Sequence, residues 1–134
     1  MTPTSPYQVF LVEDNALIAE QERYLLLRWG YIVTGWATSA AAALHSLRQH
    51  RPDIVLINVQ LAGRSDGIDL ARMIQALWMI PVIIISGFLW HNLSERIHLL
   101  KGVSFLQKPF LPFQIKEIVQ FVLSNRDTPG QTSM

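Results

Sequence analysis

Four short apolar runs constrain the fold of this chain more than any other feature of its sequence. Each is about as long as a strand and most are rich in β-branched residues. They lie at Val9 to Val12, Ile54 to Ile57, Val82 to Ile85 and, more weakly, Val103 to Leu106. A fifth, more mixed run covers Tyr31 to Trp36. Continuous apolar runs of this length are typical of strands covered on both faces, as in a parallel sheet.

Stretches with helical periodicity separate these runs. The first covers Asn15 to Trp29, and Gly30 is in position to end it. Its apolar residues are Leu17, Ile18, Tyr24, Leu25 and Leu27. Further helices are expected at Ala40 to Gln49, from Asp66 or Gly67 through Leu77, from Asn92 or Ser94 to Leu100, and from Pro112 through about Ser124. Strands alternating with helices predict one α/β domain: a parallel sheet with helices on both faces.

Composition excludes several classes of function. The chain has 134 residues, the usual size of one domain, and a formal net charge of +1, which gives no reason to expect nucleic acid or a membrane surface as a partner. It has no cysteine, which excludes disulfides, zinc–thiolate sites and thiol catalysis. No apolar run approaches the roughly 20 residues that span a bilayer. We expect a cytoplasmic domain over residues 7–124, with a disordered N-terminus at 1–6 and a flexible tail at 125–134.

Polar residues follow four of the apolar runs. Glu13 and Asp14 come after the first, Asn58 after the second, Ser86 after the third and Lys108 shortly after the fourth. The carboxyl ends of parallel strands share one edge of a sheet, which is where ligands of such folds bind. The sequence therefore predicts one crevice that holds two carboxylates, an amide, a hydroxyl and an ammonium group.

These residues resemble the response regulator receiver domain of bacterial two-component signalling, of the chemotaxis-regulator-like type. The resemblance covers about Tyr7 to Ser124, and the stretches that carry it are Leu11 to Asn15, Pro52 to Ile57, Asp66 to Ile68, Ile84 to Gly87 and Lys108 to Phe110. It implies a flavodoxin-like, doubly wound five-stranded sheet of order 2-1-3-4-5. It also implies phosphorelay signalling with a sensor histidine kinase or other signalling proteins as partners.

The resemblance also implies roles for single residues. The acidic pair Glu13 and Asp14, with the backbone carbonyl of Gln60, corresponds to the Mg²⁺ site of the family. Ser86 and Lys108 correspond to the residues that contact the phosphoryl group, and Phe105 to the aromatic switch. In the family the peptide bond before the proline that corresponds to Pro109 is cis.

Asn58 departs from the family, which has a nucleophilic aspartate at this position. An amide is a poor nucleophile and forms no acyl phosphate, so we expect no phosphotransfer at residue 58. We also expect weak Mg²⁺ binding, because one carboxylate is lost beside the ion. Either the domain is held in one conformation, or its switch answers to another signal. One alternative stays open: Asn58 is an engineered replacement in a receiver that normally accepts a phosphoryl group.

The predicted activity is therefore protein–protein contact and not enzyme catalysis. Phe88, Trp90 and Phe113 are candidate interface residues on the face made by the fourth helix, fifth strand and fifth helix, where a homodimer is one expected complex. The alternative, equally weighted, is that Trp90 packs locally. Trp29, Trp36 and Trp78 are expected to close the core.

Two other classes of function fit the sequence less well than a receiver domain. A metal-dependent phosphohydrolase is remote, because it needs an aspartate nucleophile with a second acid two residues later. A flavin- or nucleotide-binding domain needs a Gly-rich or Ser/Thr-rich phosphate loop after the first strand, where this chain is acidic. We expect no DNA-binding or catalytic output segment within this chain after the last expected helix, and the chain is compatible with being part of a longer regulator.

Overall fold

A five-stranded parallel sheet forms the centre of the molecule. The computed structural model describes residues 6–59, 66–86 and 101–126. The strands follow the order β2-β1-β3-β4-β5, and all neighbouring pairs are parallel. They are β1 (Gln8–Glu13), β2 (Ile32–Ala37), β3 (Ile54–Val59), β4 (Val82–Ser86) and β5 (Val103–Gln107). Both the α/β class and the strand order predicted from the sequence are confirmed.

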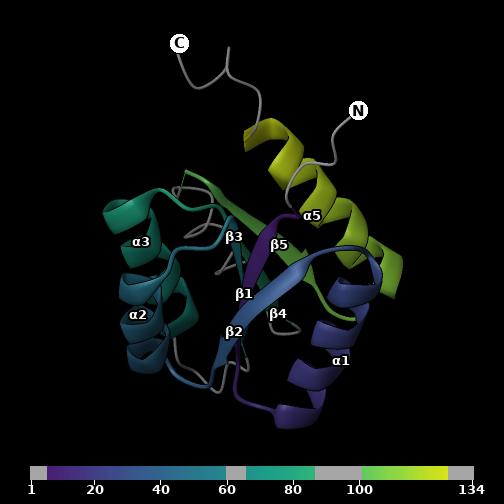
Figure 1. Cartoon of the computed structure of the whole chain (residues 1–134), viewed down its shortest axis with the longest axis horizontal. Coiled ribbons are helices and arrows are strands. Elements are labelled where there is room, and N and C mark those ends of the chain that lie inside the picture. The colour runs from purple at the N-terminus through teal and green to yellow at the C-terminus, as the bar shows by residue number, and fades with distance from the viewer. Residues whose placement is uncertain (1–5, 60–65, 87–100, 127–134) are drawn as a thin grey trace.

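Helices cover both faces of this sheet. Figure 1 shows α1 and α5 on one face, and α2 and α3 on the other. Their bounds are α1 (Ala16–Arg28), α2 (Ala40–Gln49), α3 (Asp66–Trp78) and α5 (Pro112–Arg126). The helix expected between Asn92 and Leu100 lies outside the described residues. Within the described part of the chain, no helix has the length and apolar character needed to cross a bilayer.

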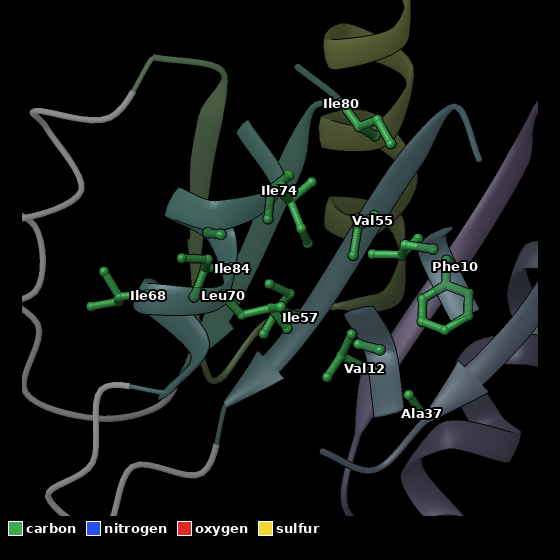
Figure 2. Close-up of a cluster of buried hydrophobic side chains, with 14 residues drawn as sticks. Phe10, Val12, Ala37, Val55, Ile57, Ile68, Leu70, Ile74, Ile80 and Ile84 are labelled. Atoms are coloured by element: carbon green, nitrogen blue, oxygen red, sulfur yellow. The ribbon is translucent and has the colours of Figure 1, made fainter. Parts of the chain in front are cut away.

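Two apolar clusters, one on each face, hold the layers together. Successive side chains of a strand point to opposite faces, so Phe10 and Val12 of β1 join one cluster, while Val9 and Leu11 join the other. The first cluster packs against α2 and α3, and Figure 2 shows its side chains from β1, β3 and α3 meeting in one layer. The second packs against α1 and α5. The inner strands β1, β3 and β4 are therefore buried on both faces, which is why they read as continuous apolar runs, whereas the edge strands β2 and β5 are only partly buried.

Helix α1 begins and ends where the sequence predicts, and the structure shows which of its faces meets the core. The Asn15 side chain accepts hydrogen bonds from the backbone N–H groups of Leu17 and Ile18, and Gly30 has a positive φ of 95° just after the helix. Leu17, Tyr24 and Leu27, which belong to the apolar pattern of this helix, are 69%, 58% and 44% exposed. The buried residues are Ala19, Glu22 and Leu26. Because the buried stripe includes an acidic residue, the positions of the apolar residues alone do not identify the inward face of this helix.

The tryptophans divide in the same way. Trp29 and Trp78 are partly buried and pack against the two clusters, as expected. The expectation for Trp36 is wrong, because this residue is exposed on β2, which lies at the edge of the sheet. Its indole N–H donates a hydrogen bond to the backbone oxygen of Glu13 over 2.6 Å. Trp36 therefore lies next to the carboxyl end of β1, where the predicted crevice is located.

Candidate functional site at the carboxyl edge of the sheet

Glu13 and Asn58 lie side by side at the carboxyl ends of β1 and β3. They are partners in the parallel register of these strands. Each comes two residues after a member of the cluster under α1 and α5, Leu11 on β1 and Leu56 on β3, so both side chains point to that face. Glu13 is 1% exposed and Asn58 is 5% exposed. The structure thus brings together the acidic and amide residues that the sequence placed in one crevice, and it buries both.

A third polar residue, Glu22 of α1, completes this group. It is 6% exposed, and its Oε2 atom accepts a hydrogen bond of 2.9 Å from Nδ2 of Asn58. The sequence analysis missed Glu22, because it looked for polar residues only where strands end. The signal was present: Glu22 is three residues after Ala19 and four before Leu26, so helical geometry places all three on one stripe.

Burial dominates the electrostatics of the two glutamates. Burial, and after it the negative charge of Glu13, raise the pKa of Glu22 from 4.5 to about 7. The hydrogen bond from Asn58 and the positive charge of Lys108 oppose this rise. Burial also raises the pKa of Glu13 above its ordinary 4.5, against the lowering effect of the Asn15 backbone N–H. Residue 58 is an amide and not an acid, but Glu22 provides a carboxyl group at the same site.

Two buried oxygen atoms of this group lack a hydrogen-bond partner among the described residues. They are Oε1 of Glu13 and Oδ1 of Asn58. The other oxygen of Glu13, Oε2, accepts a hydrogen bond of 2.8 Å from the backbone N–H of Asn15. Buried acceptors are almost always satisfied in native proteins, by protein, water or an ion. Carboxylate and carbonyl oxygens are the donors that Mg²⁺ prefers, so this set of atoms fits a hard cation.

The site is not a ready-made cage of acidic side chains. Within the described residues, no group of three or more His, Cys, Asp or Glu side chains is placed to hold a metal ion. Asp14, the second residue of the predicted acidic pair, is exposed. A cation here would therefore depend on the two buried glutamates, on Asn58 and on water. Such a set of ligands is sufficient for Mg²⁺, which usually keeps several waters and binds one or two carboxylates.

The remaining predicted residues surround the group only in part. Lys108 is half-buried, its charge lowers the pKa of both Glu13 and Glu22, and the Lys108–Pro109 peptide is cis, as the resemblance implied. Phe105 is half-buried and packs against the cluster under α2 and α3. Phe113 is 52% exposed at the start of α5, and its role in an interface stays a prediction. Gln60, Phe88, Trp90 and the side chain of Ser86 lie outside what the structure describes.

Comparison with known protein families gives a match over most of the chain. The model of the response regulator receiver domain matches residues 9–120. The transcriptional regulatory protein PdtaR of Mycobacterium tuberculosis is 32% identical over 105 residues, which cover 78% of this chain and 51% of PdtaR. The polar-differentiation response regulator DivK of Brucella anthropi is 33% identical over 107 residues, which cover 78% of this chain and 85% of DivK.

Solved structures show the same architecture. The anti-anti-sigma factor PhyR from Bartonella quintana superposes with a TM-score of 0.78 at 28% identity, over 98% of this chain and 53% of that one. A CheY-like receiver domain from Methylobacillus flagellatus superposes with a TM-score of 0.74 at 27% identity, over 88% and 99% of the two chains. The chain thus spans about half the length of PdtaR and of PhyR, and nearly all of the receiver from Methylobacillus.

Proposed function

This chain belongs to the response regulator receiver domain family, and from that premise we propose that it is a receiver that accepts no phosphoryl group at residue 58. It acts in two-component signalling through protein–protein contacts, as a cytoplasmic module and not as an enzyme. Its partners are a sensor histidine kinase or other signalling proteins, and a second copy of the chain is a further candidate at the face that includes Phe113. What the larger relatives regulate is no part of this proposal.

One observation supports the proposal above the others: residue 58 is a buried amide that is already engaged. Asn58 follows the run of β3 at the edge where ligands of this fold bind, and its Nδ2 atom donates to Glu22. Attack on phosphorus needs a carboxylate oxygen with a negative charge, which an amide lacks. The conformation of the domain is therefore not controlled by an acyl phosphate at residue 58.

Incubation with acetyl phosphate and mass spectrometry test this proposal directly. We expect no phosphoryl adduct on the unmodified chain and an adduct on the Asn58→Asp variant, because the substitution restores a nucleophilic oxygen without changing the size of the side chain. A stoichiometric adduct that maps to residue 58 of the unmodified chain would overturn the proposal. Equal behaviour of the two chains would show that the site is misassigned.

The alternative in which Asn58 replaces a native aspartate makes the same prediction for this chain and differs only in its origin. The codon for residue 58 in the native gene separates the two. An aspartate codon would assign phosphoryl acceptance to the native protein, and an asparagine codon would make the engaged amide its working state.

A further inference from the structure

In the proposed function the buried Glu22 serves only as the acceptor that engages Asn58. It lies on α1, outside the strand ends that make up the crevice, yet its Oε2 atom is 2.9 Å from Nδ2 of Asn58. A glutamate that is 6% exposed loses its hydration. One hydrogen bond from a neutral amide compensates for only a small part of the free energy that this loss costs. Its position next to residue 58 suggests that its charge replaces the one that Asn58 lacks.

We propose that Glu22 is a ligand of a divalent cation, bound together with Glu13 and Asn58, and that it supplies the carboxylate missing from residue 58. Oε1 of Glu13 and Oδ1 of Asn58 are buried and have no hydrogen-bond partner among the residues that the structure describes, and they are the independent sign that a ligand is accepted here. The cation is a hard one of the Mg²⁺ class, because every donor is a carboxylate or carbonyl oxygen and the chain has no cysteine.

The geometry of the fold supports this assignment from three elements. Glu13 on β1 and Asn58 on β3 are register partners, and their side chains point toward the face covered by α1. Glu22 extends from α1 and accepts the hydrogen bond from Asn58. The Nδ2 donor of Asn58 binds Glu22, which turns the amide so that Oδ1 is free for another partner. Two carboxylates and one carbonyl oxygen, with water in the remaining positions, are a sufficient set for Mg²⁺.

This site differs from the acidic pair implied by the resemblance. That pair uses adjacent residues on one loop, Glu13 and Asp14, and Asp14 is exposed here. In our assignment the second carboxylate comes from a helix, so cation binding ties α1 to the ends of β1 and β3. The inference does not depend on whether residue 58 accepts a phosphoryl group, and its test contains no phosphoryl donor.

Calorimetric titration with Mg²⁺ at constant ionic strength tests the assignment. Glu22→Gln keeps the size of the side chain and an acceptor for Asn58 but removes the charge, and it is expected to weaken binding roughly 10- to 100-fold. Glu20→Gln is the matched control: it removes an exposed charge from the same helix and is expected to change the dissociation constant by less than about twofold. The double variant Glu22→Gln with Asn58→Asp returns the carboxylate to residue 58 and is expected to recover the affinity.

Several results would overturn the proposal. They are no binding by the unmodified chain, equal affinity of the unmodified chain and Glu22→Gln, or a double variant as weak as Glu22→Gln alone. If Glu22→Gln fails to fold by circular dichroism, the ¹³C resonance of the Glu22 side-chain carboxyl in the unmodified chain decides the question. It is expected to shift on addition of Mg²⁺ while that of Glu20 stays in place, and a Glu22 resonance that does not respond would refute direct binding.

Discussion

At the scale of single residues, the cost of burying Glu22 determines how the domain responds to pH. In the unfolded chain its pKa is the ordinary 4.5, whereas in the folded chain burial and the nearby Glu13 raise it to about 7. Between these values the folded chain binds more protons than the unfolded one, so the free energy of unfolding falls as the pH rises. The stabilising contribution is complete below pH 4.5 and is lost as the pH passes through about 7.

Urea unfolding in EDTA at about pH 5 and about pH 8 measures this effect. A pKa raised from 4.5 to about 7 corresponds to about 3 kcal/mol at most, and we expect the unmodified chain to be less stable at the higher pH by an amount of that order. Glu22→Gln should flatten the dependence and stabilise the chain at pH 8, since it removes the charge and keeps the contact with Asn58. The raised pKa of Glu13 leaves a residual slope of the same sign.

Glu20→Gln provides the comparison, because Glu20 lies on the same helix and is exposed. Its variant should keep the full pH dependence of the unmodified chain. If Glu22→Gln and Glu20→Gln unfold with the same dependence on pH, the buried carboxyl is not the group that titrates.

At the scale of elements, α1 shows where the sequence was sufficient and where it was not. All five strands were predicted within about two residues. The inner strands β1, β3 and β4 are covered on both faces, so the change from apolar to polar residues marks where they end. The ends of α1 were predicted from Asn15 and Gly30, whose capping roles depend on local geometry alone. Its inward face was not, because apolar residues occur around most of the helix and only contact with the sheet selects one stripe.

The same reasoning explains the candidate site. Glu13, Asn58 and Lys108 were found because the carboxyl ends of parallel strands must share an edge. Glu22 was not found, because no rule of strand order places a helix residue against a strand end. Its contact with Asn58 depends on the angle at which α1 crosses the sheet, and that angle is a property of packing. A charged residue on a helix stripe with Ala19 and Leu26 is nevertheless a signal that later sequence analyses can use.

Substitution of two neighbouring leucines of α1 tests which face of this helix meets the core. Leu26 is fully buried, whereas its neighbour Leu27 is 44% exposed. Leu26→Ala is expected to lower the free energy of unfolding by about 2–5 kcal/mol, because it leaves a cavity in the cluster under α1 and α5. Leu27→Ala is expected to cost less than about 1 kcal/mol. Urea unfolding of the two variants measures both values, and similar losses would mean that the helix is rotated.

At the scale of the whole molecule, one sheet separates two apolar clusters that share no side chain. Ile74 of α3 belongs to one cluster and Ile115 of α5 to the other, and both are buried. The strands between them contribute alternate residues to each side, so neither cluster survives without the sheet. The two faces must therefore fold together, although side chains on opposite faces do not touch.

This arrangement predicts a single unfolding transition with additive effects from the two faces. Ile74→Val and Ile115→Val should each lower the free energy of unfolding by about 1 kcal/mol, and the double variant should lose their sum within about 0.5 kcal/mol. Circular dichroism and tryptophan fluorescence should give the same midpoint, because Trp78 reports on one cluster and Trp29 on the other. Two separate midpoints would show that the two faces do not unfold together. A double variant that departs from the sum by much more would show that the sheet transmits strain from one face to the other.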